Sequence, residues 1–329
     1  MKCSNSSNEA SRVIYERKNH FLVLTLIVLL VESIAWGLPQ PNRKNLSCKT
    51  LRSMARVYMA YGEYTKAQPL AEQALIFAKE RGEPDFELAM CLIDLATLYK
   101  SQGKLLEAED FCEQGLKLQE KVLYKSHPYV AYTLRTLASI YLDLGDYDKA
   151  SSAMDKAMAI MLESHTENDK SLAPFWVDIA SILVAKGDYQ KAESYYDKAM
   201  KLINASYGPD HLYTANVLSS VAKLYTLQGK QDEAEKIIDR TIAKQEKIYG
   251  QGHHLVAPSW LIKAMICRAK GNNTDSEELF KKALDSVRKS GNMALFTKLE
   301  KNVEEIRTNN QSTSRSVAKV VNKNSKATR

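Results

Sequence analysis

Cysteine and histidine, which often act as nucleophiles, bases and metal ligands, are few in this sequence and form no recognisable catalytic motif. The five cysteines form no CxxC pair, so neither a zinc site nor a redox dithiol is indicated. His253 and His254 are adjacent, yet neighbouring loop residues need a third ligand close by to hold a metal ion. The sequence also contains no glycine-rich phosphate loop, nucleophile elbow or HExxH motif. We therefore predict no catalytic residue, no metal site and no cofactor.

A repeat explains most of these residues. Glycines stand 41 residues apart once and 42 residues apart four times, at Gly62, Gly103, Gly145, Gly187, Gly229 and Gly271. Alanine occupies the place seven residues before each of them, at Ala55, Ala96, Ala138, Ala180, Ala222 and Ala264. Alanine also stands five residues after each glycine but the last, where Ser276 replaces it; these alanines are Ala67, Ala108, Ala150, Ala192 and Ala234. Small residues at fixed places let two helices approach closely, so the sequence predicts six stacked helix pairs.

Histidine and cysteine fit the same register. His127, His211 and His253 are spaced by 42 or twice 42 residues, with Asp169 at the equivalent place between them. We expect these residues to close the loops onto the helices that follow. Cys112 and Cys267 fall where other copies have packing residues, which favours buried thiols. In an oxidising compartment a disulfide between Cys91 and Cys112 remains an alternative, because the spacing neither requires nor forbids it.

The pattern resembles the tetratricopeptide repeat, and its 42-residue period resembles the long-helix subclass of kinesin light chains. The resemblance implies an all-α, right-handed α-solenoid whose first helices line a concave groove that binds peptides or protein surfaces. Function must then be argued from groove residues, since repeat arrays are interaction surfaces. In the third repeat we expect helices over about residues 128–144 and 149–162, with Asp148 capping the second. Asp232 with Glu235, and Thr274 with Glu277, have capping-box spacing.

The groove is expected to present two neighbouring columns, at nine and six residues before each glycine. Two positions three residues apart lie on one helical face. With nearby charged positions, the candidate groove residues are Asp94, Thr97, Arg135, Thr136, Ser139, Asp143, Asp178, Ser181, Ser220 and Lys223. Kinesin-type grooves carry Asn in the first column, where this chain has Ser, Thr or Asp; the Lys/Asn set with which chaperone-binding relatives grip a carboxylate is also missing. We expect an extended polypeptide ligand of mixed charge, held between the second and fifth repeats. Alternatively, these residues are merely solvated and the convex side or loops bind the partner.

Charge and hydropathy divide the rest of the chain. The net charge of +7 lies at the ends, because residues 38–306 contain 36 basic and 36 acidic residues. A neutral body argues against nucleic acid as a partner. The apolar run at residues 21–31 follows basic residues and precedes Ala35-Trp36-Gly37. This pattern is typical of a secretory signal, or of a membrane anchor acting through residues 21–36.

The expected organisation is a signal or anchor (1–37), a linker (38–50), six repeats (51–290), a closing helix (291–307) and a basic disordered tail (308–329). The array would then lie outside the cytosol, in an exported or membrane-anchored protein. The predicted function is a non-catalytic scaffold or adaptor that binds a protein or extended peptide. The alternative is an accessory module of an enzyme complex, or an enzyme whose site no motif reveals.

Overall fold

The computed structural model describes residues 47–209, 211–293 and 295–308. Every regular element in these ranges is helical. The chain divides into two compact units, residues 1–83 and 84–329. The expected signal or anchor segment and the basic tail lie outside the described residues. No helix within the described ranges is both long and apolar enough to cross a membrane.

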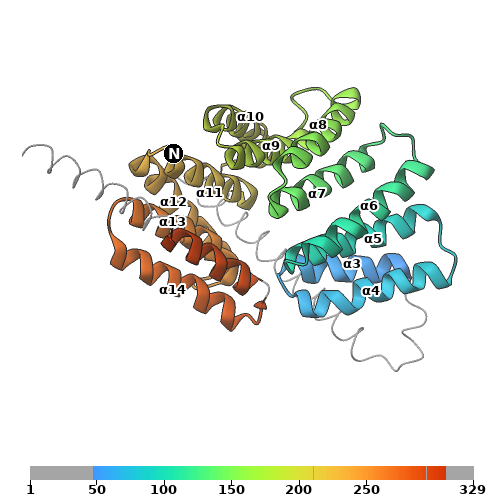
Figure 1. Cartoon of the computed structure of the whole chain (residues 1–329), viewed down its shortest axis with the longest axis horizontal. Coiled ribbons are helices and arrows are strands. Elements are labelled where there is room, and N and C mark those ends of the chain that lie inside the picture. Colours follow the sequence, from blue (N-terminus) through green and yellow to red (C-terminus); the bar gives the residue numbers. More distant parts are fainter. Residues whose placement is uncertain (1–46, 210, 294, 309–329) are drawn as a thin grey trace, which may run out of the picture. The chain divides into compact units, whose positions relative to one another are not determined.

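Helices follow one another as antiparallel pairs within each unit (Figure 1). The first unit holds α3 (Cys48–Ala60) and α4 (Tyr64–Glu80). The second holds α5 (Asp85–Ser101), α6 (Leu105–Val122), α7 (Pro128–Leu144), α8 (Tyr147–Ser164), α9 (Ala173–Lys186), α10 (Tyr189–Tyr207), α11 (Leu212–Leu227), α12 (Gln231–Tyr249), α13 (Ala257–Ala269) and α14 (Asn273–Lys289). In the second unit each pair also packs on the next, as expected for an α-solenoid of tetratricopeptide-type helix pairs.

The repeated glycine ends the first helix of a pair. Gly145 has φ of +83°, a left-handed conformation that a side chain disfavours. The turn is closed by backbone hydrogen bonds from Gly145 N to Leu142 O (3.2 Å) and from Asp146 N to Tyr141 O (2.9 Å). Bonds of this kind satisfy carbonyls that the end of a helix leaves unpaired. The predicted helix over 128–144 is therefore confirmed at both ends.

The second helix begins earlier than predicted, because the residue directly after the glycine is the cap. Asp146 accepts a hydrogen bond from Lys149 N, and α8 begins at Tyr147. The prediction that Asp148 caps this helix was wrong: Asp148 lies in the first turn and pairs with Lys186 at 2.9 Å. The two predicted capping boxes were also wrong, since α12 begins after Lys230 and α14 is capped by Asn272.

The same hydrogen bond recurs in the loops between helix pairs, which confirms the expected role of the histidines. Nδ1 of each histidine accepts a hydrogen bond from the backbone N–H two residues later, at 3.1 Å for His127, 3.1 Å for His211 and 3.2 Å for His253. Asp169 does the same through Oδ1, at 2.8 Å from Ser171 N. An accepting Nδ1 carries no proton, so these caps need neutral imidazole.

This requirement predicts a pH dependence at His253. Burial lowers the pKa of His253 below its usual value of 6.5, so the folded state binds its proton less readily than the unfolded state. The stability contributed by this cap is present above the unfolded pKa and is lost as the pH falls from about 6.5 through the lowered folded value. We expect His253→Asp, which copies Asp169, to remove that part of the pH dependence of the melting temperature. An unchanged pH profile would show that this cap does not titrate.

The alanines lie where helices cross, which confirms the register. Ala96, Ala138, Ala150, Ala180 and Ala192 are all 0% exposed. They belong to one apolar cluster that runs through several repeats and includes Trp176 and Tyr196. Within this cluster, helix pairs therefore cover the apolar faces of neighbouring pairs.

A last helix, described at residue 293 and over residues 295–308, closes the second unit. Phe296, Leu299 and Val303 are buried on it and join the apolar cluster of Trp260 and Phe280. Its polar residues are mostly exposed, and one of them, Lys298, places Nζ 3.3 Å from a carboxylate oxygen of Asp143, which is 155 residues earlier in the chain. The terminal helix thus caps the last repeat with one face and reaches α7 with the other.

Candidate functional site

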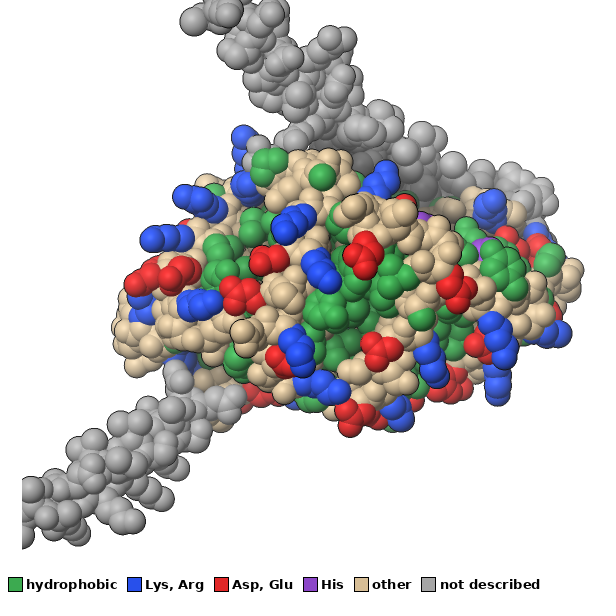
Figure 2. All heavy atoms as spheres, turned by 90° about the horizontal axis from the view of Figure 1, so that it is seen from above, with side chains coloured by type: hydrophobic (Ala, Val, Ile, Leu, Met, Phe, Trp, Pro, Cys, Tyr) green, Lys and Arg blue, Asp and Glu red, His purple; other side chains and the backbone are tan. Residues whose placement is uncertain are grey.

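The predicted groove residues all lie in the second unit, on the first helices of successive pairs. These helices are α5, α7, α9 and α11. In the structure some of the residues form an ion pair, and some are hydroxyls bonded to their own helix. One is a buried carboxylate, and the others line a cavity. Basic and acidic side chains alternate over the face in Figure 2, without a continuous patch of either sign. This agrees with the neutral composition of the repeats.

Arg135 and Asp178 pair with each other. Nε of Arg135 on α7 donates to Oδ2 of Asp178 on α9 at 2.5 Å, and the two side chains are 34% and 25% exposed. The guanidinium also lies over the ring of Phe175, 5.7 Å from its centroid. The sequence suggested that each of these charges would contact the ligand separately. In the structure they already pair with each other and so link two repeats.

Aromatic rings lie beside this pair, and the repeat pattern did not indicate them. Tyr132 is 38% exposed and its ring centroid lies 5.5 Å from that of Phe175. Burial raises the pKa of Tyr213 to about 12, with Arg135 lowering and Asp178 raising it by smaller amounts. The signal that could have found Tyr132 is its position three residues before Arg135, on the same helical face. We call Tyr132, Arg135, Phe175, Asp178 and Tyr213 the aromatic end of the groove.

The hydroxyls of the columns mostly bond to their own helices. Thr97 donates to Ile93 O at 3.0 Å, Thr136 to Tyr132 O at 3.0 Å and Ser139 to Thr136 O at 2.7 Å. A hydroxyl whose proton is used in this way still has lone pairs to accept hydrogen bonds. These residues can therefore receive N–H groups from a ligand backbone but are not free donors.

Asp94 does not fit the expectation of an open groove residue. It is only 4% exposed, and Leu92 and Leu95 on the same helix are buried with it. The prediction rested on helical spacing, which fixes a direction around the helix axis but does not reveal what covers that face. Its carboxylate is thus not presented on the open surface.

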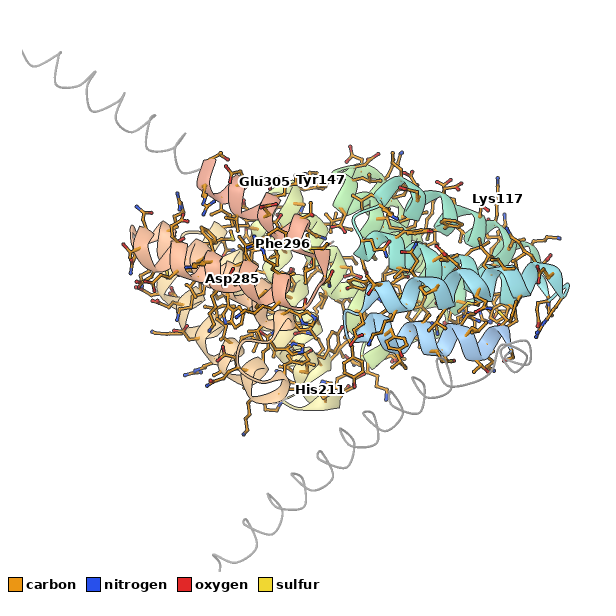
Figure 3. The ribbon with its side chains drawn as sticks, turned by 90° about the horizontal axis from the view of Figure 1, so that it is seen from below. Lys117, Tyr147, His211, Asp285, Phe296 and Glu305 are labelled. Atoms are coloured by element: carbon orange, nitrogen blue, oxygen red, sulfur yellow. The ribbon has the colours of Figure 1, made fainter. Side chains whose placement is uncertain are left out.

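The remaining candidates converge on one cavity of about 770 Å³. Asp143, Ser181, Ser220 and Lys223 line it from α7, α9 and α11. The terminal helix lines the same cavity with Lys298, Lys301, Asn302 and Glu305, and α5 adds Lys100. Glu305 and Tyr147, which both line it, lie close together in Figure 3. We call this the lysine cavity.

The charges in the lysine cavity are unevenly matched. Asp143 lies 3.5 Å from Lys100 Nζ and 3.3 Å from Lys298 Nζ, so one carboxylate serves two ammonium groups. Burial, and secondarily the charge of Lys298, lower the pKa of Lys223, while Glu305 opposes the shift. Ser181 Oγ lies 3.1 Å from the hydroxyl of Tyr196, a buried residue on α10. The cavity is suited to bind charged or polar groups, and nothing in its lining forms a nucleophile with a base.

The cysteines do not suggest chemistry either. Cys91 and Cys112 are both buried, and no disulfide joins them. The thiol of Cys112 donates to Thr133 O at 3.7 Å, and burial raises its pKa to about 12. A thiol with so high a pKa is a poor nucleophile and metal ligand. Among the described residues, no group of three or more His, Cys, Asp or Glu could hold a metal ion.

Known proteins resemble this chain over most of its described length. The family model of the MalT-like TPR region matches residues 37–207, and two tetratricopeptide-repeat models match 171–247 and 257–286. The Arabidopsis thaliana protein kinesin light chain-related 1 is 27% identical over 111 residues, which are 33% of this chain and 18% of the relative. The chain thus spans less than a fifth of the length of this curated relative.

Two solved structures share the fold. BtubC (BKLC) from P. vanneervenii has a TM-score of 0.51 and 19% identity, covering 75% of this chain and 93% of its own. NprR in complex with its cognate peptide NprX has a TM-score of 0.60 and 16% identity, covering 87% and 82%. Together with the helix pairs, the glycine turns and the 42-residue period, the family-model matches establish that the chain belongs to the tetratricopeptide-repeat family.

Proposed function

We propose that this protein is a non-catalytic scaffold that binds an extended polypeptide along the face formed by α5, α7, α9 and α11. The observation that carries the proposal is the convergence of four predicted groove residues on one cavity, together with the aromatic end on α7 and α9. A hollow with a few placed polar groups and an exposed aromatic ring, that of Tyr132, can hold an extended peptide. The fold supports such a role, and NprR, which shares it, has been solved with its cognate peptide.

The parts of the groove suit different parts of a peptide. Hydroxyls of Thr97, Thr136 and Ser139 keep acceptor capacity for backbone N–H groups. The exposed ring of Tyr132 offers a large contact area at low entropic cost. The pair of Arg135 and Asp178 can bind a ligand charge of either sign without leaving a lone buried charge behind. A ligand of mixed charge and extended conformation fits this arrangement.

The test is to reverse the ion pair in place. A partner is first captured from an extract of the source cells with the wild-type protein. In Arg135→Glu with Asp178→Lys the two charges exchange positions, so the pair can re-form and the fold is retained. We expect the affinity for the captured partner to fall about tenfold or more, because ligand groups then meet like charges. The measurement is a titration by isothermal calorimetry.

A matched control reverses a pair on second helices. Lys282 on α14 and Glu246 on α12 form a pair with 3.2 Å between Nζ and Oε1. Lys282→Glu with Glu246→Lys should leave the partner's affinity within a factor of about two, as expected for a surface pair far from the contact. Equal affinities of both variants and the wild type, with melting temperatures unchanged, would move the binding site away from this face.

We also propose that the protein is exported or membrane-tethered, with its repeats outside the cytosol. The support is the apolar run at residues 21–31 between basic residues and Ala35-Trp36-Gly37. Sequencing the amino terminus of the protein from its source, together with protease accessibility, decides the matter. A cytosolic protein that retains residues 21–31 would contradict the proposal.

A further inference from the structure

The lysine cavity carries a surplus of positive charge. Its lining includes four lysines, Lys100, Lys223, Lys298 and Lys301, and two carboxylates, Asp143 and Glu305. The free cavity therefore has two positive charges that its own acidic residues do not neutralise. The repeats as a whole are neutral, so this surplus is a local feature.

The surplus is centred on Lys223. Lys100 and Lys298 share Asp143, and Lys301 lies 3.9 Å from Glu305. Lys223 forms no salt bridge with any carboxylate of the described residues. Neighbouring charge and burial both disfavour its ammonium form, as the direction of its pKa shift indicates. An anion entering the cavity would relieve this cost.

Two hydroxyl groups line the same cavity as this ammonium, that of Ser181 on α9 and that of Ser220 on α11. The Ser181 hydroxyl donates to Val177 O at 2.9 Å and lies 3.1 Å from the hydroxyl of Tyr196, so it keeps acceptor capacity but is not a free donor. The cavity thus presents ammonium and hydroxyl groups, and none of the charged groups in its lining is a guanidinium. Arginine binds carboxylate or phosphate through a planar fork, whereas lysine acts as a point charge on either anion, so selection in this cavity depends on how much negative charge the ligand group carries.

We propose that the lysine cavity binds a phosphorylated side chain of the partner polypeptide, with Lys223 as its main cation and the terminal helix supplying Lys298 and Lys301. This inference rests on the proposed function and adds the chemistry of one ligand group. A phosphorylated residue carries a charge of about −1.5 to −2 near neutral pH, which matches the surplus. A single carboxylate would leave about one positive charge uncompensated. The terminal helix is thereby part of the binding site as well as the cap of the last repeat.

The experiment uses two small probes and the full chain. N-acetyl-phosphoserine amide and N-acetyl-glutamate amide are titrated at constant ionic strength, and binding is followed through the side-chain resonances of labelled lysines. We expect the phosphoserine probe to bind saturably and the glutamate probe to bind at least about tenfold more weakly. The resonances of Lys223 should shift, with a raised pKa in the bound state.

Substitutions of single lysines test whether the probe binds in the lysine cavity. Lys223→Gln and Lys298→Gln should each lower the affinity for the phosphoserine probe about tenfold or more, as expected for loss of a charge-assisted contact. The control is Lys117→Gln, an exposed lysine on α6 that lies far from Glu305 in Figure 3. It should leave the affinity unchanged. Melting temperatures verify that each variant is folded.

Three results would overturn the inference. The first is no saturable binding of the phosphoserine probe, and the second is equal affinity for the glutamate probe. The third is equal loss of affinity in Lys117→Gln and Lys223→Gln, which would indicate a diffuse charge effect. None of these results bears on partner capture or on its dependence on Arg135 and Asp178. Failure of this inference is therefore distinguishable from failure of the proposed function.

Discussion

Replacing Trp260 by alanine is expected to lower the free energy of unfolding by about 3–5 kcal/mol, the usual cost of removing a large aromatic core residue. The side chain is 1% exposed and packs in the cluster that holds Phe280, Phe296 and Leu299. Its ring also carries the ammonium of Lys282 at 4.2 Å from the centroid. The substitution therefore loosens the last repeat and the terminal helix together.

The loss should come from packing and not from hydrogen bonding. The indole Nε1 of Trp260 is buried without a hydrogen-bond partner among the described residues. Trp260→Phe should thus cost much less than Trp260→Ala, because it keeps a ring and removes an unsatisfied donor. Urea denaturation measures both. Leu227→Ala, at a position 39% exposed, is the control and should change the stability by less than about 0.5 kcal/mol. Equal losses in Trp260→Ala and Leu227→Ala would contradict the description of this core.

Enlarging the alanines at the helix crossings is expected to cost about 1–3 kcal/mol in each case. Ala150 on α8 and Ala192 on α10 are 0% exposed within the same apolar cluster. A leucine at either place has no room, so the two helices of the pair must move apart. Because repeats are stabilised by their neighbours, the effect should spread to the adjacent pairs.

The matched control is a leucine on the open face of the same helix. Ser194 on α10 is exposed, and Ser194→Leu should shift the melting temperature little. Calorimetry of Ala150→Leu, Ala192→Leu and Ser194→Leu makes the comparison. A similar loss in all three would mean that the helices meet in a different register.

Much of the fold could be predicted because the same residue types recur at the same place in each repeat. The glycine turn, the two alanine positions and the histidine loops each recur several times, and each was confirmed in the structure. The predicted start of α8 was two residues too late, because the sequence offers Asp146 and Asp148 as two aspartates that could each cap the helix. Only the backbone after the left-handed glycine decides between them.

The site was less predictable, because it depends on how successive pairs rotate against each other. Helical spacing placed Asp178 in the first column and Arg135 next to it in the preceding repeat, but it could not tell that their side chains meet at 2.5 Å. The contact of Lys298 with Asp143 joins residues 155 positions apart, and no sequence period connects them. The burial of Asp94 likewise depends on what lies over its helix. Tertiary arrangement, which periodicity does not encode, supplies these features.

The central claim is that the partner binds the face of α5, α7, α9 and α11. Hydrogen–deuterium exchange of the full chain, alone and with the captured partner, tests it most directly. We predict slower exchange in the partner complex over Pro128–Leu144, Ala173–Lys186 and Leu212–Leu227, with little change over Tyr147–Ser164 and Tyr189–Tyr207. Slower exchange confined to the latter helices, or to the loops, would contradict the claim.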